Sequence, residues 1–166
     1  DIICVPFDLC GPHQGSRMGS LAMRLEGLEE QLRNLRQESN VIEASKLSAE
    51  LPGDRQTCDS KAIEVFMATK VAVTESLKSG SVPLVIGGDH SIAIGSISGA
   101  LQEYGDDLGV LWIDAHMDLN TPITSPTGNL HGMPLAVLTH LEYGLDLQNK
   151  PEWFDTCVQS WAKLRN

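Results

Sequence analysis

Two short apolar runs constrain the fold of this chain more than any other feature. Val82–Ile86 and Val110–Ile113 are continuously apolar rather than alternating, and the stretch between them includes Ser91–Leu101, a run of small and apolar residues typical of a helix. Continuous apolar strands separated by helices are typical of a parallel sheet that helices cover on both faces. We therefore predict an α/β fold in which both runs are buried strands.

Other segments fit the same plan. The β-branched run Ile2–Val5 predicts a further strand. Leucines at three- and four-residue spacing over residues 21–35 predict one amphipathic helix, and a second helix is predicted from about Asp59 to Leu77. Within the helix that includes Gly95 and Gly99, these glycines would allow close packing on the sheet.

Composition excludes several classes of protein. With 42% hydrophobic and 20% charged residues, and no linker or repeat, residues 1–166 are predicted to form a single globular domain. No apolar run approaches the roughly 20 residues that span a bilayer. The formal charge of −10 argues against nucleic acid or an anionic membrane as a partner. The four widely spaced cysteines indicate reduced thiols and a cytoplasmic protein. Because the chain starts at Asp1 without Met, we expect a few residues before it.

A cluster of ionisable side chains follows the second apolar run. Asp114, His116 and Asp118 occupy alternate positions, so in an extended chain they point to the same side. Carboxylates with imidazole suit manganese or another borderline divalent ion, and two adjacent carboxylates in a crevice are costly unless a cation neutralises them. A polar turn at the end of a strand would account for any one of these residues alone. It accounts less well for three ionisable residues at alternate positions.

The first apolar run ends in Gly87-Gly88-Asp89-His90. The two glycines allow a tight turn and close backbone approach, which places His90 at the end of a neighbouring strand. Ligands of parallel sheets bind at the carboxyl ends of the strands. A phosphate-binding loop is the competing interpretation, but neither spacing typical of such loops is present. We therefore predict that His90 is a further metal ligand.

The segment 119–134 is predicted to be an ordered loop, since it contains three prolines and two glycines. Its amide and hydroxyl side chains could cap turns, or they could hold the amino and carboxylate groups of an amino acid. His131, near the end of the loop, could transfer protons at neutral pH.

Three motifs in these segments resemble the arginase (ureohydrolase) family: Gly87–Ser91, Asp114–Pro122 and Gly128–Pro134. The resemblance covers roughly residues 1–140. It implies a three-layer α/β fold with two Mn²⁺ ions bridged by hydroxide, and hydrolysis of the guanidino group of L-arginine to ornithine and urea. It also implies a cytoplasmic enzyme of arginine metabolism and the urea cycle, and a homotrimer.

The resemblance also implies a role for each residue. His90 would ligate one Mn²⁺ and His116 the other, while Asp114 would bridge the pair. Asp118 would ligate the ion held by His90, and His131 would serve as the proton shuttle.

Substrate contacts are implied in the loop. The residues that match the family's contacts to the α-amino and carboxylate groups of arginine are Asn120, Thr127 and Asn129. Thr127 stands where arginases usually have serine, which keeps the hydroxyl and adds a methyl group.

The family also uses a later Asp-x-Asp-x-x-Asp-Pro motif, which is absent from this sequence. Family members are roughly twice this length, so we expect the N-terminal portion of the fold, with an exposed apolar sheet edge. Two alternatives remain open. One is a truncated, non-catalytic relative with partial metal binding, which associates through that edge or through the aromatic side chains of Trp153, Phe154 and Trp161. The other is a ureohydrolase for another guanidino compound such as agmatine.

Overall fold

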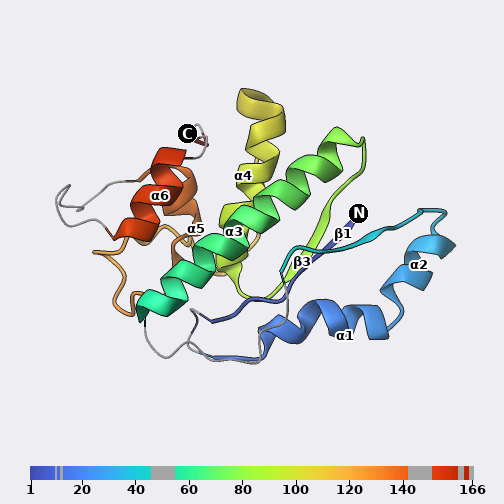
Figure 1. Ribbon diagram of the computed structural model, residues 1–166, viewed down its shortest axis with the longest axis horizontal. Coiled ribbons are helices and arrows are strands. Elements are labelled where there is room, and N and C mark those ends of the chain that lie inside the picture. The colour runs from blue at the N-terminus through green and yellow to red at the C-terminus, as the bar shows by residue number, and fades with distance from the viewer. Residues whose placement is uncertain (10, 12, 46–54, 142–150, 161–162, 165–166) are drawn as a thin grey trace.

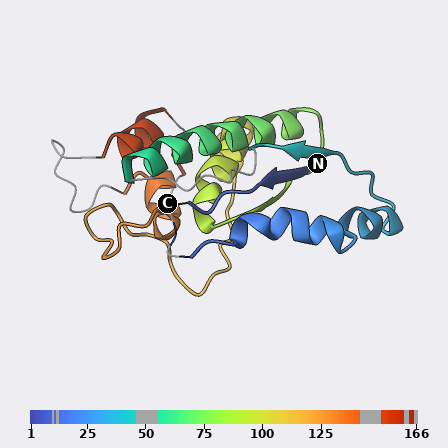
Figure 2. The ribbon, with the colours of Figure 1, turned by 60° about the horizontal axis from the view of Figure 1, so that its bottom comes forward.

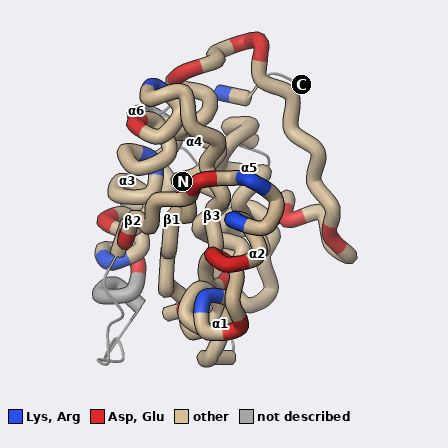
Figure 3. Tube along the Cα trace, turned by 90° about the vertical axis from the view of Figure 1, so that its right-hand side faces the viewer, with Lys and Arg blue, Asp and Glu red and all other residues tan. Residues whose placement is uncertain are grey.

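The computed structural model describes residues 1–9, 11, 13–45, 55–141, 151–160 and 163–164. Its three-stranded parallel sheet has the order β2-β1-β3, and the strands stand side by side in Figure 3. The strands are β1 (Ile2–Val5), β2 (Val41–Glu43) and β3 (Leu84–Gly87). This confirms the predicted parallel α/β fold and two of its strands, whereas the short β2 was not predicted.

Helices cover both faces of the sheet. The α-helices are α1 (Gly19–Leu25), α2 (Leu28–Asn34), α3 (Arg55–Lys78), α4 (Ala93–Tyr104), α5 (Pro134–Leu138) and α6 (Glu152–Ser160). Single turns of 3₁₀ helix are η1 (Ser16–Met18), η2 (His90–Ile92), η3 (Gly105–Asp107) and η4 (Leu130–Gly132). Figure 2 shows α3 on one side of β1 and α1 with α2 on the other. In Figure 1, α5 and α6 lie together at one end.

The central strand β1 is buried on both faces. Ile3 and Val5 belong to the main hydrophobic core, whose other members include Phe66 of α3 and Ile94 of α4. The alternate side chains, Ile2 among them, belong to a smaller cluster with α2. Successive side chains of a strand point to opposite faces, so a continuously apolar strand must be covered twice.

The predicted single helix over residues 21–35 is instead two helices. α1 ends at Leu25, and α2 begins at Leu28 after Gly27, which adopts φ +89°. Glycine reaches this left-handed conformation without steric cost, and it interrupts the helix there.

The glycines of α4 pack against a helix, not against the sheet as predicted. A methyl group at Gly95 would lie 2.5 Å from the carbonyl oxygen of Phe66. One at Gly99 would lie 2.6 Å from the carbonyl oxygen of Lys70. Both carbonyls belong to α3, so the small-residue stripe lets two helix backbones approach each other closely.

The prediction of a buried strand over Val110–Ile113 is wrong. The segment is assigned to no strand, and the residues Leu111 and Ile113 are 84% and 87% exposed. Among the described residues no strand runs beside it, so its backbone has no neighbouring strand with which to form hydrogen bonds. Leu84 of β3, 42% exposed, marks the apolar sheet edge that the sequence predicts.

Exposed apolar side chains on this segment should promote self-association rather than stability. The double substitution Leu111→Thr and Ile113→Thr is expected to leave the Tm within about 2 °C of the original, because exposed positions typically change stability by less than about 0.5 kcal/mol. The concentration at which the protein aggregates should rise, as measured by light scattering. A clear fall in Tm would contradict the observed exposure.

The aromatic residues near the end of the chain belong to the core. Trp153 and Phe154 of α6 are 4% and 0% exposed. They are therefore not a free surface for association, whereas Trp161 lies outside the described residues. The main core draws side chains from β1 through α6, and the single domain over 1–166 stays a prediction. No helix within the described ranges is both long and apolar enough to cross a membrane.

Candidate metal centre

Three of the predicted metal ligands meet at the carboxyl end of β3. His90 Nε2 lies 3.1 Å from Asp114 Oδ2, and His90 Nδ1 lies 3.8 Å from Asp118 Oδ2. One ligand atom from each of the three residues lies within 4.8 Å of the others. Residues from two separate chain segments therefore converge on a point that one divalent ion could occupy.

The donor atoms fit a cation. Asp114 Oδ2 and Asp118 Oδ2 are buried and accept no hydrogen bond. Buried carboxylate oxygens that accept no hydrogen bond are costly in a protein, and a metal ion is one of the few groups that satisfy them. Oxygen and imidazole donors without a cysteine suit Mn²⁺ and similar ions.

The two carboxylates differ in electrostatics. The backbone N–H of His116, which donates to Asp114 Oδ1 at 2.9 Å, is the main cause that lowers the pKa of Asp114. Burial raises the pKa of Asp118, and the neighbouring Asp114 carboxylate raises it further. Asp118 therefore gains most from a nearby positive charge.

Backbone contacts place His90 at this position. The N–H of Asp89 donates to the carbonyl oxygen of Phe7 at 2.9 Å. A methyl group at Gly88 would overlap that carbonyl group. The close approach predicted from the glycine pair is thus confirmed, and it ties the end of β3 to the end of β1.

His116 is not part of the three-residue group. Its side chain is 82% exposed, and its Nδ1 lies 3.5 Å from Asp114 Oδ1. The chain bends at residues 115–116, and Asp118 adopts φ +48°, so the expected strand-like alternation does not hold here. The role of His116 as a ligand stays a prediction.

The loop that follows closes on itself. Asn120 N–H donates to the Gly132 carbonyl at 3.1 Å, and Leu135 N–H donates to the Asp118 carbonyl at 3.1 Å. These bonds bring the end of the loop, with His131, back to its beginning near the metal ligands. The pairing between residues so far apart has no signal in the local sequence pattern.

The three predicted substrate contacts lie in this loop, and the side chains of two of them accept hydrogen bonds within it. Asn120 Oδ1 accepts from the Thr124 hydroxyl at 3.3 Å, and the Thr127 hydroxyl accepts from the Asn129 N–H at 3.3 Å. The turn-capping interpretation therefore applies to Asn120 and Thr127 as they stand. Binding of an amino acid by these groups stays a prediction.

A buried ion pair that was not predicted holds the loop after β1. Asp8, which is fully buried, lies 2.7 Å from Arg17 Nε through Oδ1. Its Oδ2 accepts from the N–H groups of Gly15 at 2.6 Å and Arg17 at 3.1 Å. The only available signal was an acidic residue three positions after a strand and before a glycine-rich loop.

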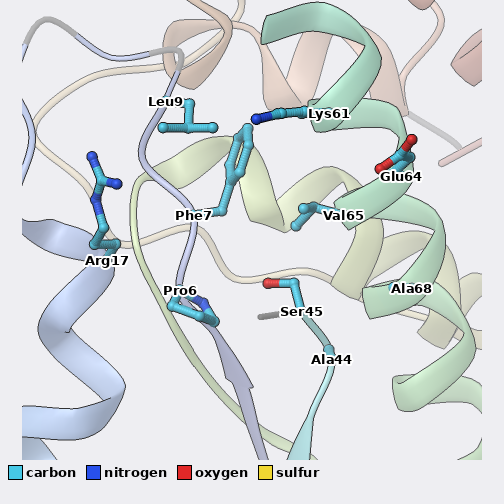
Figure 4. A pocket seen from close by; sticks show the side chains of 10 residues that line it. All are labelled: Pro6, Phe7, Leu9, Arg17, Ala44, Ser45, Lys61, Glu64, Val65 and Ala68. Atoms are coloured by element: carbon cyan, nitrogen blue, oxygen red, sulfur yellow. The ribbon is translucent and has the colours of Figure 1, made fainter. Parts of the chain in front are cut away.

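Arg17 also borders a cavity of about 360 Å³ at the carboxyl ends of β1 and β2, opposite Lys61 of α3 (Figure 4). Among the described residues that line this cavity, Glu64 is the only carboxylate and none is a histidine. The group of potential metal ligands therefore lies elsewhere, after β3.

Comparisons with known proteins agree with this architecture. The sequence profile of the Arginase family matches residues 1–158. Arginase of Bacillus caldovelox is 43% identical over 142 residues, which cover 81% of this chain and 46% of that protein. Human Arginase-1 is 43% identical over 145 residues, covering 82% and 43%. The crystal structure of arginase from Bacillus cereus superposes with a TM-score of 0.79 at 31% identity, covering 99% of this chain and 53% of that one. The chain thus spans about half the length of the relatives it matches.

Proposed function

The chain belongs to the arginase family, and from this premise we propose that it takes part in manganese-dependent hydrolysis of L-arginine to ornithine and urea. The observation that carries the proposal is the convergence of His90, Asp114 and Asp118, with two buried carboxylate oxygens that have no hydrogen-bond partner. The similar proteins named as arginases support the substrate class.

In this proposal four residues of the chain bind the metal ions. His90, Asp114 and Asp118 hold one Mn²⁺, while His116, next to Asp114, contributes to a second ion. Divalent ions at such a site supply an activated water by lowering its pKa toward neutrality. Asp118 is thereby both a ligand and part of the catalytic group.

Other residues handle the proton and the substrate. His131 transfers the proton to the leaving amine, a task for which imidazole is suited at neutral pH. Asn120, Thr127 and Asn129 orient the amino and carboxylate groups of arginine. Because Asn120 and Thr127 already accept hydrogen bonds within the loop, substrate must compete with those bonds.

Urea release by the purified 166-residue chain, with Mn²⁺ and with EDTA, tests this function directly. We expect release from arginine that requires Mn²⁺ and exceeds release from agmatine. The variant His131→Asn should lose about 10²–10⁴-fold in kcat, the typical contribution of a general acid or base. His13→Asn, at an exposed position, should not change it. A faster release of urea from agmatine than from arginine would instead identify a ureohydrolase that acts on agmatine.

A second candidate is a non-catalytic relative that binds metal only partly. It is favoured by one observation, namely that the described residues bring three ligands together rather than the larger set that two ions need. Calorimetric titration with Mn²⁺ separates the candidates. Two tight sites support the enzyme, whereas one weak site together with no urea release supports the second candidate.

The resemblance extends the proposal to assembly and cellular location. We propose a homo-oligomer, a trimer as in the family, in the cytoplasm. Sedimentation equilibrium of the purified chain tests the assembly.

A further inference from the structure

The cavity at the carboxyl ends of β1 and β2 has a volume of about 360 Å³ (Figure 4). Small-molecule sites in proteins typically begin at about 300 Å³, so this space admits a small organic molecule. The apolar residues that line it are Pro6, Phe7, Leu9, Ala44, Val65 and Ala68. None of the described lining residues belongs to the metal group of His90, Asp114 and Asp118, so the cavity is separate from that site.

One wall of the cavity is held by the hydrophobic core. Phe7 is 3% exposed, and its ring packs edge-on against Phe66 of α3 with 6.1 Å between the ring centroids. Val65, on the same helix, packs against the main core. Side chains fixed in this way need little further ordering when an apolar group binds to them, which lowers the entropic cost of binding.

Two cationic side chains border the cavity, and both are at least partly shielded from water. The side chain of Arg17 is 12% exposed, and Asp8 balances its charge at 2.7 Å. Lys61 is half-buried and extends from α3 past the Phe7 ring (Figure 4). Glu64, a carboxylate of the lining, is exposed, so water screens its charge. The shielded charges that line the cavity are thus positive, which favours an anionic ligand.

The lining also holds a polar atom that lacks a partner. Ser45 Oγ is buried and forms no hydrogen bond with the described residues. In Figure 4 it points from the end of β2 toward the segment with Pro6 and Phe7. A buried hydroxyl is costly unless an acceptor takes its hydrogen bond, and an oxygen of a bound molecule would do so.

We propose that this cavity binds a small organic monocarboxylate whose body is mainly apolar. Lys61 pairs with the carboxylate, the body lies against Phe7 and Val65, and the Ser45 hydroxyl donates to a further oxygen of the ligand. A neutral apolar molecule would give the Lys61 ammonium no counterion, and an organic cation would be repelled by Lys61 and Arg17. The proposal goes beyond the hydrolysis of arginine and does not rest on it.

Binding of 5-oxohexanoate to the metal-free 166-residue chain, measured by calorimetry, tests the proposal. This probe carries a carboxylate, an apolar chain and one carbonyl oxygen. Its neutral amide, 5-oxohexanamide, should bind about 10-fold or more weakly, because a charge-assisted interaction is lost. Lys61→Met should weaken binding of the carboxylate to a similar extent. Acetate, which lacks the apolar body, should also bind at least about 10-fold more weakly, since each buried methylene contributes about fourfold.

Lys78→Met is the matched control, because it removes a lysine of the same helix whose side chain is 51% exposed. It should leave the affinity unchanged. The NMR signals of the Val65 methyl groups should shift when the probe is added. Those of Val73, which belongs to the core and is not among the lining residues, should not. The NMR shifts and the amide comparison decide the matter even where Lys61→Met does not fold.

Equal affinities for the probe and its amide would overturn the proposal, as would an unchanged affinity in folded Lys61→Met. Absence of saturable binding, or shifts confined to residues outside the cavity, would overturn it as well. Removal of metal beforehand keeps the carboxylate from binding an ion at the metal group. Absence of urea release would count only against the proposed function.

Discussion

Substitution of Gly88 by alanine is expected to prevent this chain from reaching a stable fold. A methyl group at this position would overlap the carbonyl group of Phe7 and would lie 3.0 Å from the backbone nitrogen of Phe7. Because the obstacle is backbone rather than the end of a side chain, relief requires the segments after β1 and β3 to move apart. Such movement would break the hydrogen bond from Asp89 N–H to Phe7.

The expected loss is more than about 4 kcal/mol, in the exceptional range for a single substitution and a large share of the roughly 5–15 kcal/mol that stabilises a domain. Urea denaturation followed by circular dichroism measures it. Gly109→Ala is the matched control, since nothing lies within 4 Å of a methyl group there. Equal denaturation midpoints for the two variants would show that the two segments do not approach as closely as described.

Asp118→Asn is expected to change metal affinity and metal-free stability in opposite directions. Loss of an outer-shell partner of a metal ligand typically costs about 10–100-fold in affinity. We therefore expect loss of the ligand itself to weaken Mn²⁺ binding by at least about 100-fold, as measured by calorimetry. Asp107→Asn, at an exposed position in η3, makes the same change in net charge and should leave the affinity unchanged.

Without metal, the same substitution should raise the Tm at neutral pH. Burial and the nearby Asp114 carboxylate raise the pKa of Asp118, so its ionised form opposes folding. A carboxyl group with a raised pKa costs nothing at low pH, where it is protonated in both states. The cost appears as the pH rises from about 4, the ordinary value of aspartate, through the raised pKa.

The gain in Tm from Asp118→Asn should therefore be absent below about pH 4 and largest above the raised pKa. We expect the Tm of the variant in EDTA to exceed that of the unmodified chain. Saturating Mn²⁺ should reverse the order, because a ligand at 100 times its Kd stabilises by about 2.7 kcal/mol. A lower Tm for the variant in EDTA at neutral pH would contradict the electrostatic account of Asp118.

Elements with strong local patterns could be predicted from the sequence. The elements β1, β3, α3 and α4 all correspond to predicted segments. Apolar runs and helical periodicity show which side chains of an element are buried, whatever the element packs against. The break at Gly27 had a local signal, a glycine inside a helical pattern, but leucine spacing on both sides outweighed it. Val110–Ile113 has the composition of a buried strand, but the prediction of a strand there is wrong. A strand is buried only where a neighbouring strand and a covering layer pack against it, and composition alone does not show whether they are present.

The candidate site divides in the same way. His90, Asp114 and Asp118 follow apolar runs at predictable positions, and they converge as predicted. His116 differs because the bend at residues 115–116 turns the chain before the alternation is complete. The buried Asp8–Arg17 pair depends on how the loop after β1 folds back on itself, for which the sequence offers only a weak signal.

By itself, the sequence determined the fold class, the family and the residue types available for a metal, since these depend on local pattern and on motifs of fixed spacing. The tertiary structure alone decided which ligands meet and which glycine permits β1 and β3 to approach. The physical reason is distance along the chain. Hydrogen bonds such as Leu135 N–H to the Asp118 carbonyl join residues whose proximity arises only when the whole loop has folded.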